Sequence, residues 1–188
     1  MGVPRRSRSR RPPPELRPGW RDLHLAVLTA ATAWSTALGW QAQLVSHPLF
    51  RAVREEDFSA YHRQYDRTIP VVVIVPGIAS FLAGCAFWWT RPVDVPRPVA
   101  AVVAAAGAVS LGSTALWAVP MHDRLDRVGR SEATIDSLLR ANLLRSAALT
   151  VSTATLVGTV WRRSATRSPA GAGRPPTSVG RTRSPAAV

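Results

Sequence analysis

Long stretches without a formal charge most restrict how this chain of 188 residues can fold. Residues 25–46, 68–90 and 98–121 contain no charged side chain and are 22, 23 and 24 residues long. At a rise of about 1.5 Å per residue, a helix of each length crosses a hydrocarbon layer of about 30 Å. The sequence therefore predicts an all-α fold, an integral membrane helix bundle in a single domain.

A fourth apolar stretch, Ser146–Trp161, has 16 residues and reaches about 24 Å as a helix, too short to span alone. Upstream, Ser131 is a suitable helix N-cap and the acidic Glu132 follows it in the first turn. We therefore expect one long helix, from about Glu132 to Trp161, whose first third contains polar residues.

Four spans divide the chain into a membrane domain and two tails. The spans are expected at about 23–45, 68–90, 98–121 and 138–161, within a transmembrane domain of residues 23–161. Residues 1–22 and 162–188 are rich in Arg, Pro, Gly and Ser, and this composition predicts disordered basic tails. The first apolar stretch is longer than the core of about 7 to 15 residues in a cleaved signal peptide, so we interpret it as a retained span.

The distribution of charge predicts the topology. All 24 basic residues are arginine. The two tails and the second connection together have a net charge of +12, and the first and third connections +1, within a total of +13. Positive segments favour the cytoplasm, so both termini are expected there, in a multi-pass protein of the cell (plasma) membrane. The tails are expected to contact anionic lipid, and no specific nucleic acid partner is predicted.

A charged amphipathic segment precedes the second span. On a helix that begins near Asp57, an aromatic and imidazole face recurs at helical spacing. The face consists of Phe58, Tyr61, His62, Tyr65 and Ile69. We expect an extra outward-side amphipathic helix that covers the mouth of the bundle and enters the second span at Pro70, with a kink there.

Other polar side chains fall at the same end of the predicted bundle, from the ends of three more helices. Together the candidate residues are His47, Tyr61, His62, Tyr65, His122, Asn142 and Arg145. Ionisable groups at the edge of a membrane are costly and mark sites. One hypothesis is a binding site for a small aromatic or amphipathic molecule, with these groups as hydrogen-bond or acid–base partners. The other is a non-catalytic accessory or assembly subunit, in which the same groups join helices.

Metal and cofactor motifs are not found in the spacing of the histidines. No H-x-x-x-H, E-x-x-H or C-x-x-C pattern occurs, so no metal or haem site is predicted, and no motif indicates another cofactor. The single cysteine, Cys85, lies inside the second predicted span and cannot form an intrachain disulfide. The spans contain no acidic residue, which argues against an ion-coupled transporter.

Four short motifs resemble a known group of proteins. They are HPLF at His47–Phe50, F-x-x-Y-H-x-x-Y at Phe58–Tyr65, W-x-V-P-x-H-x-x-L at Trp117–Leu125 and N-x-x-R-S at Asn142–Ser146. In this order they resemble a family of uncharacterised bacterial four-helix integral membrane proteins. More loosely, the chain is similar to the anthrone-oxygenase-like membrane family. The resemblance extends over about Leu23–Trp161.

The looser resemblance implies an oxidoreductase that oxidises a polyketide-type phenolic substrate with dioxygen. The chain departs from the two patterns at one position each. His122 stands where the oxygenase-like pattern has asparagine, and Leu143 stands where the uncharacterised group tends to have tryptophan.

Overall fold

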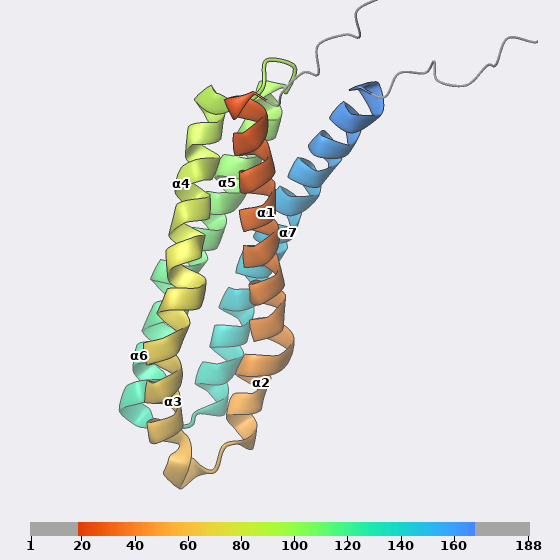
Figure 1. Cartoon of the computed structure of the whole chain (residues 1–188). Coiled ribbons are helices and arrows are strands. Elements are labelled where there is room, and N and C mark those ends of the chain that lie inside the picture. Colours follow the sequence, from red (N-terminus) through yellow and green to blue (C-terminus); the bar gives the residue numbers. More distant parts are fainter. Residues whose placement is uncertain (1–18, 168–188) are drawn as a thin grey trace, which may run out of the picture.

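Helical rods that run alternately up and down form an elongated bundle (Figure 1). The structure is a computed structural model and describes residues 19–167. Trp20 and Arg167, at the two ends of this region, lie at the same end of the bundle, called the terminal end below. The opposite end, called the distal end below, contains the connections at residues 53–54 and 129–131. In chain order the elements are α1 Trp20–Gln41, η1 Ala42–Ser46, α2 His47–Leu49, η2 Phe50–Ala52, α3 Glu55–Ile69, η3 Pro70–Ile74, α4 Val75–Thr90, α5 Arg97–Ser113, η4 Thr114–Ala118, α6 Val119–Val128 and α7 Glu132–Arg167. The first rod consists of α1 to η2, the second of α3 to α4, the third of α5 to α6 and the fourth of α7.

The all-α class is confirmed for the described residues, which contain no strand. Three continuous helices are long and apolar enough to cross a membrane, namely Glu55–Thr90, Arg97–Val128 and Glu132–Thr166. The first rod, which begins with α1, is not among these three. Its threonine, serine and tryptophan residues, together with His24, lower the hydropathy of the stretch that the sequence predicts as the first span.

Two hydrophobic clusters hold the bundle together, one toward each end. Near the terminal end, Leu28 and Phe87 pack with Val103 and Leu156, from four different rods. Near the distal end, Phe50 and Phe58 pack with Leu125, Ile135 and Leu138. Both α7 and α4 contact α1 on one side and α5 on the other. The rods therefore form a closed ring around a common interior.

Each of the first three rods contains one π-helical turn, and each of these turns ends two residues before a proline. η1 ends before Pro48, η3 before Pro76 and η4 before Pro120. Proline has no N–H for the carbonyl four residues earlier, and its ring clashes with that carbonyl. We therefore attribute the π-helical form of the preceding turn to the proline that follows it.

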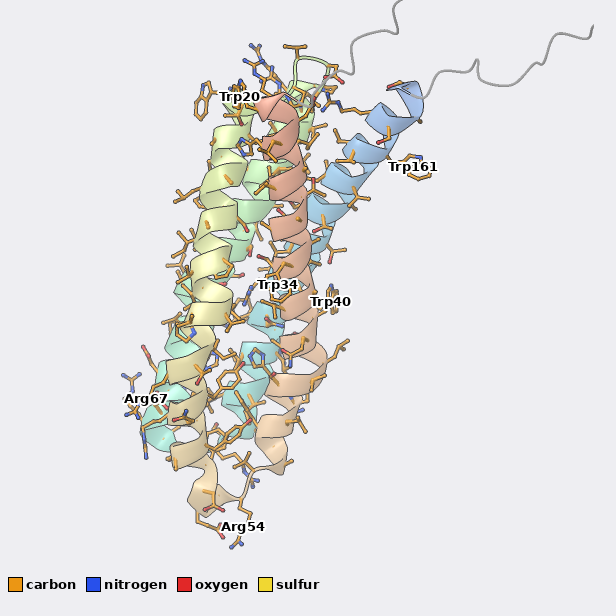
Figure 2. All side chains as sticks on the ribbon, in the orientation of Figure 1. Trp20, Trp34, Trp40, Arg54, Arg67 and Trp161 are labelled. Atoms are coloured by element: carbon orange, nitrogen blue, oxygen red, sulfur yellow. The ribbon has the colours of Figure 1, made fainter. Side chains whose placement is uncertain are left out.

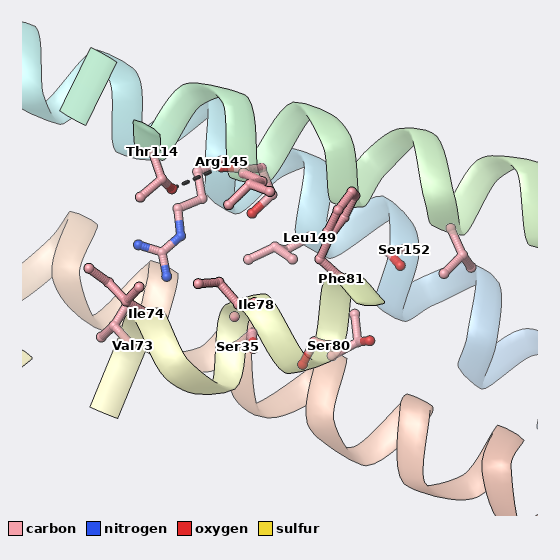
Figure 3. A pocket seen from close by; sticks show the side chains of 16 residues that line it. Ser35, Val73, Ile74, Ile78, Ser80, Phe81, Thr114, Arg145, Leu149 and Ser152 are labelled. Carbon is pink, nitrogen blue, oxygen red and sulfur yellow. Dashed lines mark hydrogen bonds between the residues drawn. The ribbon is translucent and has the colours of Figure 1, made fainter. Parts of the chain in front are cut away.

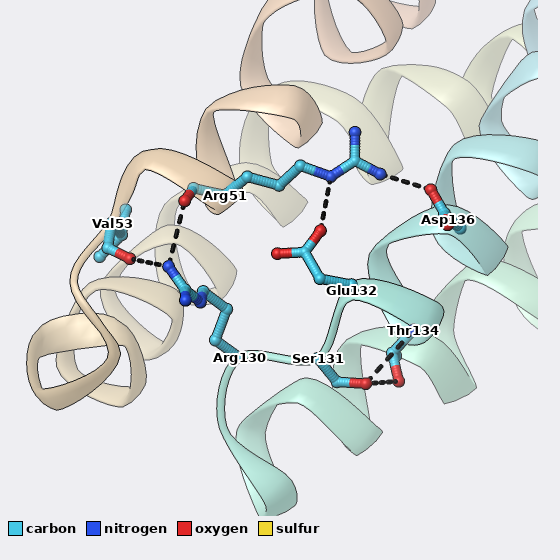
Figure 4. Close-up of polar contacts among 7 residues, drawn as sticks. All are labelled: Arg51, Val53, Arg130, Ser131, Glu132, Thr134 and Asp136. Carbon is cyan, nitrogen blue, oxygen red and sulfur yellow. Dashed lines mark hydrogen bonds and ion pairs between the residues drawn. The ribbon is translucent and has the colours of Figure 1, made fainter.

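Polar contacts tie the first and third connections together at the distal end (Figure 4). Arg51 Nε donates to Glu132 Oε2 at 2.8 Å, and Arg51 also pairs with Asp136. Arg130 donates to the carbonyls of Arg51 and Val53, at 3.1 Å each. These contacts hold the ends of the first and fourth rods in one place.

The start of α7 agrees with its sequence prediction. α6 ends at Val128, and Gly129 adopts a φ of 77°, a left-handed conformation that favours glycine. The chain then enters α7 at Glu132, where the amide of Thr134 donates to Ser131 Oγ at 3.4 Å. The predicted N-cap and the predicted first residue of the long helix are both confirmed.

The amphipathic segment enters the second span at Pro70, as predicted, and α3, η3 and α4 form one continuous helix of 36 residues. Figure 2 shows Arg67 of α3 pointing away from the bundle, as its position on the helix predicts. α7 extends to Arg167, so residues 162–167 are helical, and α1 begins at Trp20, inside the predicted tail. The rest of both predicted tails lies outside the described residues.

Candidate functional site

A large cavity of about 530 Å³ opens between the rods in the half of the bundle toward the distal end. All three π-helical turns contribute to its wall, through Ala42 and Ser46 of η1, residues 70 and 72–74 of η3, and Thr114 and Ala118 of η4. α7 supplies Asn142 and Arg145. The widened turns displace the backbone where a regular helix would continue, so we attribute the space to these proline-linked turns.

Five of the residues predicted from the sequence line this cavity: His47, Tyr65, His122, Asn142 and Arg145. His62 does not line it but lies directly behind His122, with its side chain fully buried. Tyr61 is 41% exposed and is not part of the wall. The predicted convergence of four rods at one end of the bundle is therefore seen for six residues, and Tyr61 lies outside the site.

Two histidines and two aspartates form a polar group at the wall, here called the histidine–aspartate cluster and consisting of His62, Asp66, His122 and Asp126; all but His62 line the cavity. His62 Nδ1 lies 2.7 Å from Asp126 Oδ1, and His62 Nε2 lies 3.1 Å from His122 Nδ1. His122 Nδ1 also lies 3.1 Å from Asp66 Oδ1. Each histidine thus pairs with the aspartate of the opposite helix, since α3 and α6 run antiparallel.

The cluster rests on an aromatic support centred on Phe50, which is fully buried. The Phe50 ring lies 5.3 Å from the His62 ring and 5.0 Å from the Tyr65 ring, in edge-to-face geometry. Tyr65 lies nearly parallel to His122, with ring centroids 6.0 Å apart. Such packing fixes the imidazole rings in orientation, because neither ring can rotate without displacing its neighbours.

Three polar groups in the wall lack a partner among the described residues. His47 Nδ1 and Asn142 Oδ1 are buried without a hydrogen bond. The guanidinium of Arg145 makes no hydrogen bond or ion pair there. The other polar atom of Asn142 is satisfied, because Nδ2 donates to the carbonyl of Gly39 at 3.0 Å and to Gln43 Oε1 at 2.9 Å. Asn142 therefore binds the first rod.

Burial controls the protonation of His47, whose side chain is 5% exposed. Loss of hydration disfavours the charged imidazolium and lowers the pKa of His47 from 6.5 to about 3, and positive charge at His122 and Arg145 acts in the same direction. The ring is therefore neutral at pH 7. It offers the cavity an uncharged hydrogen-bonding atom.

A second, smaller cavity of about 50 Å³ lies next to the large one, toward the terminal end (Figure 3). The two cavities share Val73, Ile74, Thr114 and Arg145. Figure 3 shows the Arg145 side chain reaching from α7 toward Val73 and Ile74. Apolar residues such as Ile78, Phe81 and Leu149 line much of the small cavity, together with the hydroxyl groups of Ser35, Ser80 and Ser152. Arg145 thus lies where the two cavities meet.

Asp66 and Asp126 are functional candidates that the spacing patterns above do not predict. A usable signal is present in the sequence, because H-x-x-x-D occurs at His62–Asp66 and again at His122–Asp126. Residues four apart lie on one helical face, so each motif presents an imidazole and a carboxylate together. The two motifs are recognised only when aspartate is considered together with histidine.

The comparisons with known proteins add no relative to this picture. No family model, no curated protein and no solved structure matches the chain. The resemblances described under Sequence analysis therefore remain predictions.

Proposed function

We propose that the chain is an integral membrane protein that binds a small aromatic or amphipathic molecule in the large cavity. The exposed apolar surface supports the membrane part of this proposal. In the most apolar 18-residue window of Glu55–Thr90, only 11% of the residues are buried inside the bundle. Large apolar side chains such as Val71 and Leu116 are 70% and 84% exposed. Lipid is the natural environment for such a surface.

The observation that supports binding best is the cavity with unpaired polar groups in its wall. A volume of about 530 Å³ lies within the usual range of about 300 to 1,000 Å³ for small-molecule sites. An unpaired buried polar atom costs about 1 to 3 kcal/mol. His47 Nδ1, Asn142 Oδ1 and the Arg145 guanidinium would each gain a partner from a ligand. A bundle that served only to pack helices would not need to leave all three unpaired.

The wall also indicates the chemistry of the ligand. Ile69, Val72 and Val73 provide an apolar surface, and the ring of Tyr65 provides a flat one. Arg145 lacks a carboxylate partner among the described residues, so an anionic group or an ionised phenol on the ligand would compensate its charge. The best fit is an aromatic body with an acidic or phenolic oxygen directed at Arg145.

Equilibrium dialysis with hydroxynaphthoic acid tests this proposal. The full-length chain in lipid nanodiscs is dialysed against the compound, with empty nanodiscs as the reference. We expect saturable binding of one molecule per chain. Arg145→Gln and Tyr65→Ala should each weaken it about 10-fold or more, since a charge-assisted hydrogen bond and an aromatic contact each contribute about 1.4 kcal/mol or more.

Matched controls separate the site from general effects. Tyr61 lies one turn before Tyr65 on α3 and does not line the cavity, so Tyr61→Ala should leave binding unchanged. Arg140 lies on α7 and is exposed, so Arg140→Gln should also leave it unchanged. Naphthol, which lacks the carboxylate, should bind more weakly than hydroxynaphthoic acid. Equal losses in the site variants and their controls would contradict the proposal.

A second candidate function, the non-catalytic accessory or assembly subunit, is favoured by the hydrogen bonds of His62 and Asn142 to neighbouring rods. These bonds are what interhelical contacts in a structural bundle provide. No saturable binding above empty nanodiscs, together with a lower unfolding temperature for Tyr65→Ala, would favour this second function over the first.

A further inference from the structure

The histidine–aspartate cluster has the composition and spacing of a metal site. We propose that His62, Asp66 and His122 bind one divalent first-row transition-metal ion, with Asp126 orienting His62. One ligand atom from each of the three residues lies within 4.8 Å of the other two. This inference does not depend on the organic ligand proposed above, because the three residues are positioned by the protein alone.

Two of the three distances between the proposed ligand atoms match the edges of a metal coordination sphere, and the third is below 4.8 Å. The two imidazole nitrogens, His62 Nε2 and His122 Nδ1, are 3.1 Å apart, and His122 Nδ1 is 3.1 Å from Asp66 Oδ1. With metal–ligand bonds of about 2.1 Å, neighbouring ligand atoms are about 3.0 Å apart in octahedral and about 3.4 Å apart in tetrahedral geometry. An ion could therefore enter with small movements of the side chains.

Asp126 selects the tautomer that a metal ligand requires. Its carboxylate only accepts hydrogen bonds, so the contact of 2.7 Å means that His62 Nδ1 is the donor. The Nε2 atom of a neutral His62 then has its lone pair free, and it faces His122 Nδ1. A carboxylate behind the remote nitrogen of a histidine is the usual arrangement around metal-binding imidazoles.

Hydrogen bonds alone do not satisfy every acceptor around His122 Nδ1. A neutral His122 has at most one proton at Nδ1, yet two acceptors, His62 Nε2 and Asp66 Oδ1, lie at 3.1 Å from that atom. A cation would bond to all three atoms at once. It would also offset the two carboxylates, Asp66 and Asp126, which both lie within 3.6 Å of His62 Nδ1.

Access and ligand type narrow the choice of ion. Asp66 and His122 line the large cavity, so the ion would keep positions open toward it, for water or another small ligand. Two imidazoles and one carboxylate are borderline to hard ligands that suit Zn²⁺, Fe²⁺, Co²⁺ or Mn²⁺, in contrast to the all-oxygen sites of Ca²⁺ and Mg²⁺.

Titration of the purified full-length chain with Co²⁺ tests the proposal, because Co²⁺ in a protein site with few ligands absorbs visible light much more strongly than the pink aqueous ion, and equilibrium dialysis of the same samples counts the bound ions. After EDTA treatment and its removal, we expect one Co²⁺ per chain, displaced by Zn²⁺. His122→Ala and Asp66→Asn should weaken binding at least about 100-fold. Asp126→Asn should weaken it about 10- to 100-fold, as for other residues that orient a ligand.

Two control variants remove the same functional groups elsewhere. His24→Ala removes an imidazole from α1 near the terminal end, and Asp57→Asn removes an exposed carboxylate from the first turn of α3. Both should bind Co²⁺ as the unaltered chain does. Absence of Co²⁺ binding in the unaltered chain would overturn the proposal, and so would binding that persists in both His122→Ala and Asp66→Asn.

If the ligand variants do not fold, a measurement on the unaltered chain still tests the proposed metal ligands. X-ray absorption at the zinc edge of the Zn²⁺-loaded protein should show two imidazole rings in a shell of nitrogen and oxygen. A shell of oxygen alone, or one that contains the sulfur of Cys85, would overturn the proposed ligand set.

Discussion

His47 is a buried neutral imidazole, so acid should destabilise the fold through it. The pKa of His47 is lowered to about 3 in the folded chain, whereas in the unfolded chain it is near its ordinary 6.5. Between these values the unfolded state binds more protons, and stability is lost as the pH falls. From pH 6.5 to 5.0 this residue should cost about 2 kcal/mol.

Thermal unfolding of the EDTA-treated protein, followed by helicity at pH 7.5 and 5.0, measures this loss. His47→Gln keeps a polar side chain that does not titrate, so its unfolding temperature should fall less over the same range. Equal falls in the two proteins would mean that His47 contributes nothing to the pH dependence.

Gly39 sets the distance between the first rod and α7. A Cβ added at Gly39 would lie 2.7 Å from Ser146 Oγ, closer than side-chain atoms pack. Ser146 is fully buried and its hydroxyl has no partner among the described residues. We expect Gly39→Ala to destabilise the fold by about 1 to 3 kcal/mol, as overpacking does elsewhere. The loss is measured as a lower midpoint of unfolding.

Removing the opposing hydroxyl should reverse this effect. In Gly39→Ala combined with Ser146→Ala, the nearest atom to the new Cβ becomes the Cβ at position 146, at 3.5 Å, an ordinary contact. Gly158→Ala in α7 meets nothing within 4 Å and serves as the control. A double variant no more stable than Gly39→Ala alone would show that the approach of the backbones is not limited by this hydroxyl.

At the scale of the elements, the prolines that follow the π-helical turns determine how the helices present their side chains to the cavity. Pro120→Ala restores an N–H that can bond the carbonyl of Leu116, which would narrow η4 toward a regular helix. His122 would then rotate relative to α3. We expect slower hydrogen exchange in residues 114–122 and about 10-fold weaker binding of hydroxynaphthoic acid.

Pro98 provides the matched control for this change. It lies in the first turn of α5, where a backbone N–H has no partner within the helix. Pro98→Ala should therefore change neither exchange at η4 nor binding. Unchanged exchange in Pro120→Ala would show that the π-helical turn does not depend on the proline.

The elements were largely predictable from the sequence, because charge-free stretches have few other structures available and Ser131 marks the start of α7. The junction of the amphipathic segment with the second span at Pro70 was also anticipated, but local patterns do not show that the combined helix continues without a break for 36 residues. That continuity extends the rods beyond their apolar parts and brings Asp66 level with His122. Tyr61 was misplaced because it lies at the edge of the helical face whose centre is occupied by Phe58 and His62.

At the scale of the whole molecule, the arrangement of the rods restricts how the chain can sit in a bilayer. The helix Glu55–Thr90, with 36 residues, is about 54 Å long and exceeds a hydrocarbon layer of about 30 Å. If this helix crosses a bilayer as proposed, its distal part, α3, projects from the membrane with the histidine–aspartate cluster. If the rods cross the bilayer as proposed, Trp20 and Arg167 lie on one side and the distal end lies on the other.

Cysteine labelling in intact cells tests this arrangement and its orientation. In a Cys85→Ser background, Arg54→Cys places a thiol at the distal end, where Figure 2 shows Arg54, and Arg162→Cys places one toward the terminal end of α7. Both positions are exposed. Because the tails hold most of the excess arginine, the terminal end should face the cytoplasm. A membrane-impermeant maleimide should label Arg54→Cys in intact cells and Arg162→Cys only after permeabilisation. The reverse pattern would invert the topology, and labelling of both positions in intact cells would contradict a chain that crosses the membrane.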